Sequence, residues 1–289
     1  MALSQARRAI VWPIAFWKRL RRADVMLYAA AVAFNSFFAL VPLLLVAVAA
    51  ASFLGRDVES LDRTLESVEL FAPEAVSEVI RDVILDVEEQ LDGRQTILVV
   101  VGVLGSLFIG SRAVIAMQRA LARVEGQVEH RSRWEVRLTG IALTLAAGTA
   151  LLATTLLLVI GGAFSDFIEE ETGIGLLAGL YAVLRIPLAS VGLFLFLRVL
   201  YHWGPPDPLP ATGTAALVGT AGTVGASLLF GVYLQNADAF GTTIGALGGV
   251  AFALLWLYVG ALATIVGAAI VTNAWRYRET GEMPVTRAP

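Results

Sequence analysis

The amino-acid sequence predicts an all-α, polytopic membrane protein with six transmembrane helices, an N-terminal interfacial helix and a small extracytoplasmic helical cap. Of its 289 residues, 57% are hydrophobic and 16% are charged, whereas soluble domains average about 45–50% and about 25%. The mean hydropathy is +0.76. Six apolar runs are each long enough to cross a bilayer, which takes about 20 helical residues. The segments between these runs alternate between basic and acidic, as loops on opposite membrane faces do.

Residues 1–24 mix cations with aromatic rings and precede the first apolar run. This mixture predicts an amphipathic helix in the cytoplasmic membrane interface, with rings at headgroup depth and cations near anionic lipid. The residues concerned are Arg7, Arg8, Trp12, Phe16, Trp17, Lys18, Arg19, Leu20, Arg21 and Arg22. A cleaved signal peptide is not expected, because the apolar stretch that follows is too long for a signal-peptide core.

The transmembrane domain is predicted at residues 25–273, followed by a cytoplasmic tail at 274–289. Its spans are expected at about 25–54, 96–117, 138–164, 174–201, 211–234 and 242–273. The second and fifth spans carry small residues at helical spacing, which lets helices approach closely where lipid supplies no hydrophobic drive. Gly219, Gly222 and Gly225 of the fifth span are expected on one uncovered face, a candidate contact for a homo-oligomer.

Residues 55–95 interrupt the apolar pattern with an acidic insertion. They contain twelve acidic residues against four arginines. Apolar residues recur every three or four positions on either side of Pro73, which predicts two short amphipathic helices. The insertion is expected to form the water-exposed cap.

The arginines set the predicted orientation, because cytoplasmic loops carry an excess of Lys and Arg. The N-terminal segment and the 112–137 loop each contain six basic residues, whereas the turns at 165–173 and 235–241 contain none. Both termini, the 112–137 loop and the proline-rich loop after the fourth span are therefore placed in the cytoplasm. The expected location is the cell membrane, with the lipid bilayer as a partner.

Enzyme activity and a bound cofactor or metal are not expected. The chain has no cysteine and two histidines, His130 and His202, far apart in sequence. Metal-dependent hydrolysis needs converging ligands of these kinds or of carboxylates. Neither a Walker-type phosphate loop nor a G-x-S-x-G elbow is present. No nucleic-acid partner is expected either, because topology alone accounts for the basic 112–137 loop.

Arg185 is the most unusual residue, because it lies roughly 16 Å into the fourth span at 1.5 Å per helical residue. A charge at such depth costs about 2.5–3.5 kcal/mol on insertion scales. It indicates either a functional site or a structural arginine that ties helices together or snorkels to the headgroups. A functional Arg185 would suit an anionic or zwitterionic small molecule or lipid. Candidate cavity-lining residues are Tyr28, Asn35, Ser36, Thr154, Thr155, Tyr181 and Tyr233.

Pro42 and Pro187 lie in the opening spans of two halves that would run in opposite directions. Interrupted spans at corresponding positions are typical of transporters built from inverted repeats. Both prolines are therefore predicted as helix breaks near a central site. The alternative is that they are unrelated, since proline is common in membrane helices.

Four blocks of the sequence resemble the YihY/BrkB family of membrane proteins, and they cover nearly all of the chain in the family's order. The blocks are AAAVAFNSFFALVPLLLVAVA, GSRAVIAMQRALARVEG, LRIPLASVGLFLFLRVLYHWGPPD and GVYLQNADAFGTTIGALGGVAFALLWLYVGALATIVGAAIVTNAW. One departure is visible at Phe34 and Asn35, where the family's first span usually has a tyrosine pair. The resemblance implies a six-span inner-membrane protein. Family members have been labelled virulence or serum-resistance factors, transporters or "ribonuclease BN", and no accepted catalytic residues transfer to this chain.

Three functional hypotheses follow. The first is a transporter or lipid/solute translocator that is not driven by an ATPase of its own, with Arg185 near its cavity. The alternative is a non-catalytic envelope-integrity or scaffold protein that acts through partners. Ribonuclease activity, the third, is not expected, because the sequence lacks the ligands that this chemistry requires.

Overall fold

The computed structural model describes residues 16–53, 95–172, 176–235 and 246–280, and in these residues the chain is helical with short connections and no strand. A short N-terminal helix, Phe16–Arg22, comes first. The long helices are α2 (Val25–Phe53), α5 (Gln95–Glu125), α6 (Arg133–Thr172), α7 (Leu176–Trp203), α8 (Thr212–Gln235) and α10 (Ala246–Thr280). The predicted all-α class is therefore confirmed for the described residues.

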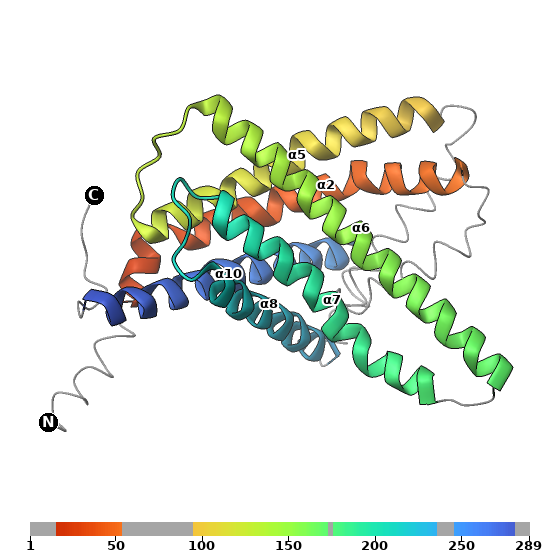
Figure 1. Ribbon diagram of the computed structural model, residues 1–289. Coiled ribbons are helices and arrows are strands. Elements are labelled where there is room, and N and C mark those ends of the chain that lie inside the picture. The colour runs from red at the N-terminus through yellow and green to blue at the C-terminus, as the bar shows by residue number, and fades with distance from the viewer. Residues whose placement is uncertain (1–15, 54–94, 173–175, 236–245, 281–289) are drawn as a thin grey trace, which may run out of the picture.

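The long helices pack as neighbouring pairs (Figure 1): α2 lies along α5, α6 along α7, and α8 along α10. Helix α10 also contacts α2, while α6 contacts α5 and α7 contacts α8, so the three pairs form one bundle. The buried core includes Ala29 of α2, Leu121 of α5, Tyr201 of α7 and Ile265 of α10. We call the end of the bundle that holds the N-terminal helix, the end of α5 and the end of α10 the termini end.

Several of these helices are long and apolar enough to cross a membrane. Four qualify individually over Val100–Glu125, Ile186–Trp203, Thr212–Leu234 and Gly248–Glu279. A fifth is obtained when Phe16–Arg22 and Val25–Leu40, bent by 55° at their junction, are taken as one span. The chain is thus a membrane protein with several apolar helices, while the count of six spans stays a prediction.

Helices in the structure extend beyond the predicted apolar spans. Helix α5 continues past Met117 to Glu125, α6 begins at Arg133, and α10 continues to Thr280. Arginine and glutamate are good helix formers, so a helix does not end where its apolar run ends. The cap at 55–95, residues 1–15 and the last part of the tail lie outside the described residues.

Pro42 and Pro187 lie inside continuous helices, so neither forms the helix break that the sequence led us to expect. Membrane helices tolerate proline where neighbouring groups compensate the lost backbone hydrogen bond. At Pro42 the neighbour is Gly105 of α5, where an added Cβ would lie 3.3 Å from the Cβ of the proline ring. Helix α2 thus continues through Pro42, whose ring packs closely against Gly105 of α5.

The connection between α5 and α6 has defined caps at both ends. Gly126 has φ of +67°, and its N–H donates to the Arg123 carbonyl oxygen, while the Gln127 N–H donates to that of Ala122. This is a Schellman motif, for which glycine is favoured because it adopts positive φ at little cost. Helix α6 starts with a capping box between Ser132 and Glu135, each side chain accepting the other's backbone N–H. The caps fix where α5 ends, and hence where Glu125 lies.

Helices α8 and α10 approach most closely where two glycines meet. A Cβ added to Gly267 would lie 2.8 Å from the Cα of Gly219 and 3.0 Å from its nitrogen. Tyr201 of α7 covers the same crossing, and its buried hydroxyl donates a 2.7 Å hydrogen bond to the Thr264 carbonyl oxygen. Such close backbone approach is how small residues hold membrane helices together.

The glycines of α8 therefore do not share one uncovered face. Gly219 is buried at the crossing with α10, whereas Gly222 is exposed and an added Cβ on Gly225 would meet open space. The expectation that all three face outward was wrong for Gly219, because helix spacing alone does not show which small residue a neighbouring helix covers.

Candidate functional site

A buried acidic residue at the termini end joins α5 to α10. The Glu125 side chain is only 2% exposed, and Arg276 of α10 donates to its Oε2 at 2.6 Å. The Thr272 hydroxyl donates to Oε1 at 2.5 Å. Arg276 also donates to the Glu125 backbone carbonyl at 3.2 Å. Each carboxylate oxygen therefore has a donor, which a buried charge requires.

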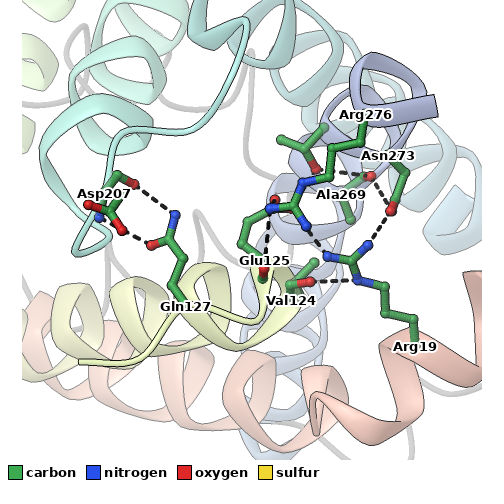
Figure 2. A network of polar contacts seen from close by, with 9 residues as sticks. Arg19, Val124, Glu125, Gln127, Asp207, Ala269, Asn273 and Arg276 are labelled. Carbon is green, nitrogen blue, oxygen red and sulfur yellow. Dashed lines mark hydrogen bonds and ion pairs between the residues drawn. The ribbon is translucent and has the colours of Figure 1, made fainter. Parts of the chain in front are cut away.

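The N-terminal helix enters the same cluster through Arg19 (Figure 2). Its Nε donates to the Val124 carbonyl oxygen at 2.7 Å, and one terminal nitrogen donates to the Asn273 amide oxygen. The other terminal nitrogen lies 4.0 Å from the Glu125 carboxylate. Asn273 is held in turn by donating to the Ala269 carbonyl oxygen at 2.6 Å. We call Arg19, Glu125, Thr272, Asn273 and Arg276 the termini-end charge network.

Two adjacent loops are joined beside this network. The Gln127 side chain donates to the Asp207 carbonyl oxygen at 2.9 Å and accepts from the Asp207 N–H at 3.2 Å (Figure 2). Arg131 donates to the Gly204 carbonyl oxygen at 3.0 Å and pairs with Glu129 at 2.9 Å. The hydrogen bond from Arg131 holds the pKa of Glu129 below its usual value. The α5–α6 and α7–α8 loops are thus fixed to each other at this end.

Exposed tryptophans surround the termini end. Trp17 precedes α2, Trp134 opens α6, and Trp203 and Trp275 lie at or near the ends of α7 and α10. Each is more than a third exposed. Tryptophan is enriched at membrane–water interfaces, because its ring is apolar and its N–H is polar. Four such rings at one end of the bundle form the pattern that a membrane interface favours, and the charge network lies at the same end.

The predicted residues of α2 lie at different heights along the helix. Tyr28 is near the termini end, with its ring 5.5 Å from the Arg123 guanidinium carbon, and Arg123 pairs with Asp24 at 2.9 Å. Asn35 donates to the Ala31 carbonyl oxygen of its own helix at 2.7 Å. Ser36 beside it is half-buried.

The other predicted lining residues lie on three further helices. Thr154 of α6 is half-buried against α7, where a Cβ added to Gly192 would collide with its hydroxyl. Tyr233 of α8 is exposed, and its ring centre lies 6.0 Å from that of Phe230, with the two rings tilted by 32°. Arg185 and Tyr181 lie within α7, and Thr155 within α6, but these three side chains lie outside the described ones. Among the described lining residues no hydrogen bond joins any two, so their common cavity stays a prediction.

Comparison with known proteins identifies the family. The family described as Virulence factor BrkB matches residues 16–288. The chain belongs to the BrkB family. The resemblance to YihY/BrkB proteins is thereby confirmed. The BrkB-family chain is also similar to the "Putative ribonuclease-like protein YfkH" of Bacillus subtilis (strain 168), with 27% identity over 217 residues. The aligned region covers 73% of this chain and 77% of that protein. No solved structure matches.

The termini-end charge network of this BrkB-family chain was not predicted from its sequence. Glu125 was not singled out from the sequence, and residue 273 entered only as the end of the sixth predicted span. A usable signal was present, because Glu125 lies at the end of a long apolar run in a segment where arginines outnumber acids. Such an acid is expected to pair with cations. The partners come from residues about 105 and about 150 positions away, which local patterns do not reveal. Among the described residues, no three His, Asp or Glu side chains form a group that could hold a metal ion.

Proposed function

We propose that this BrkB-family protein is a transporter or translocator, without an ATPase of its own, for an anionic or zwitterionic small molecule or lipid. The observation that carries the proposal is the termini-end charge network, which joins three chain segments through a buried carboxylate. Arg185, a charge inside the apolar helix α7, is the candidate substrate-binding residue. The network would serve as the gate on the termini side.

A polar closure suits a gate, because its contacts can be exchanged for water as the helices separate. Burying an ion pair contributes little net stability once the cost of removing both charges from water is counted. Opening such a closure is therefore less costly than exposing an equal area of apolar core. Arg276 is already 41% exposed on its side chain, so it needs little movement to reach water.

Removal of the Arg185 charge is expected to slow transport strongly. Vesicles containing the purified protein would be tested for dithionite-detected translocation of NBD-labelled phosphatidylglycerol and phosphatidylcholine, and for uptake of radiolabelled phosphate and glutamate. Arg185→Ala should lower the rate at least about tenfold, since a charge-assisted hydrogen bond is worth about 1.5–3 kcal/mol. Arg185→Lys should retain part of the transport rate. Arg278→Ala, at an exposed position, should leave the rate unchanged.

A rate equal to that of protein-free vesicles for every probe would contradict the transporter. The alternative would then be a non-catalytic envelope protein, with the open position Gly225 of α8 available for association. The name of the B. subtilis relative adds ribonuclease activity as a competing outcome. Incubating the same preparation with RNA and Mg²⁺ would reveal cleavage.

The termini end is proposed to face the cytoplasm, because its loops carry the arginines. The chain has no cysteine, so single cysteines report position without background. Arg278→Cys should react with a membrane-impermeant maleimide only after cells are permeabilised, whereas Glu88→Cys in the acidic 55–95 segment should react in intact cells. The reverse pattern would overturn the proposed orientation.

A further inference from the structure

Two arginines from different helices flank one exposed aromatic ring on the α5–α6 face of the bundle. The guanidinium carbon of Arg112 in α5 lies 4.6 Å from the centre of the Phe108 ring, and that of Arg137 in α6 lies 4.7 Å from it. Because both lie against the same ring, the two cations are less than about 10 Å apart. Phe108 itself is 52% exposed. We call these three residues the Arg112–Arg137 site.

The site has a surplus of positive charge. Among the described residues, neither Arg112 nor Arg137 forms an ion pair, whereas Arg19, Arg123, Arg131 and Arg276 all have acidic partners. Two exposed arginines extend the same faces: Arg119, seven residues after Arg112, and Arg133, four residues before Arg137. Residues at these spacings share one side of a helix. Four cations thus gather on one surface, and their mutual repulsion favours a bound anion.

The Arg112–Arg137 site lies within a few helical turns of the exposed tryptophans at the termini end. Gln118, six residues after Arg112, packs beside Gly204, the residue after the exposed Trp203. The Arg112 Cα is thus about 9 Å along α5 from that level and the Phe108 Cα about 15 Å, so a long arginine side chain that leaves the ring can extend toward phosphate groups. Further from the termini end, the same side of α5 exposes Val101 and Leu104. One face therefore changes from apolar to basic over a few turns.

We propose that the Arg112–Arg137 site binds the phosphate headgroup of an anionic phospholipid, with an acyl chain lying along Val101 and Leu104. The two guanidinium groups supply charge-assisted hydrogen bonds to phosphate oxygens, and the exposed apolar residues offer a surface for the hydrocarbon chain. This amphipathic order matches a lipid better than RNA, which has no apolar portion to cover the adjoining side chains. The proposal does not depend on transport.

Lipid retention measured by native mass spectrometry tests the site. The full-length protein, in a detergent solution containing equimolar phosphatidylglycerol and phosphatidylcholine, should retain phosphatidylglycerol preferentially. The double variant Arg112→Gln/Arg137→Gln should lose that preference by about tenfold or more, since each basic residue near a membrane surface contributes about a factor of five. The control Arg198→Gln/Arg278→Gln removes two exposed charges elsewhere and should retain the phosphatidylglycerol preference.

Two further measurements distinguish a phospholipid from free phosphate and from RNA. Inorganic phosphate at millimolar concentration should not displace the lipid, and binding of a 20-nucleotide RNA, followed by fluorescence anisotropy, should not depend on Arg112 and Arg137. The proposal would be overturned by an equal loss of the phosphatidylglycerol preference in both double variants. Displacement of the lipid by phosphate, or RNA binding that requires Arg112 and Arg137, would also overturn it. If the glutamine variant fails to fold, Arg112→Lys/Arg137→Lys should keep a reduced preference, because lysine retains charge without the planar fork. An unchanged preference in that variant would also contradict it.

Discussion

Replacing Gly267 by alanine is expected to lower the midpoint temperature of unfolding markedly and to separate α8 from α10. The added Cβ would lie 2.8 Å from the Gly219 Cα and 3.0 Å from its nitrogen. Both obstacles are backbone atoms, so no side-chain rotation relieves the clash and the helices must move apart. Overpacking of this kind costs about 1–3 kcal/mol, occasionally more. Thermal unfolding in detergent, followed by tryptophan fluorescence, measures the loss.

A control variant on the same helix is not expected to lower the midpoint temperature of unfolding. Gly260→Ala lies on the same helix, where the added Cβ has its nearest neighbour at 3.9 Å, an ordinary contact. Glycine costs a helix interior about 0.8–1 kcal/mol relative to alanine in soluble peptides, so this variant should be neutral or more stable. If both variants unfold at the wild-type midpoint, the close crossing of α8 and α10 is wrong.

The main outline of the fold could be predicted from local patterns. Apolar runs located the long helices, because hydrophobic length depends only on consecutive residues. The ends were less accurate: α5 runs on to Glu125 because polar residues can continue a helix. Pro42 was expected to break α2, yet α2 continues through it and its ring packs closely against Gly105 of α5. Membrane helices tolerate proline where the freed backbone groups find other partners, so the residue type alone does not decide between a break and a continuous helix.

The candidate site was less predictable than the fold. Its residues come from the N-terminal helix, the end of α5 and the end of α10, which meet only in three dimensions. Sequence reasoning selected hydroxyl and amide residues inside apolar spans, such as Asn35, whose amide is hydrogen-bonded within its own helix. It overlooked Glu125 at a span end. Depth along a span can be counted from sequence, whereas burial by neighbouring helices cannot.

Replacing Glu125 by alanine is expected to destabilise the bundle at the termini end and free the N-terminal helix. The change removes the acceptor of Arg276 and Thr272 and the charge nearest to Arg19. Breaking a buried ion pair costs about 3–5 kcal/mol, because the remaining charge is left uncompensated. The lower part of that range is expected here, since the Arg276 side chain keeps 41% exposure and can regain water. Thermal unfolding and the rate of proteolysis near Arg19 measure the two effects.

Matched variants distinguish the effect of the buried Glu125 charge from the effects of its hydrogen bonds and of an exposed ion pair. Glu125→Gln retains an oxygen acceptor for Thr272 but loses the charge, so it should be less damaging than Glu125→Ala. Glu129→Gln breaks an exposed ion pair with Arg131, which is worth about 0–1 kcal/mol. In a double-mutant cycle, Glu125→Gln combined with Arg276→Gln should cost less than the sum of the single changes, because removing one partner alone leaves the other charge unpaired. Strict additivity would mean that the carboxylate and the guanidinium do not interact. A Glu129 variant as unstable as the Glu125 variant would mean that burial of Glu125 adds nothing to the stability of the ion pair.

A gate requires coupling between Glu125 and Arg276 and a larger effect at the buried Glu125 than at Glu129, since only a coupled, buried network can hold the three chain segments closed and release them together.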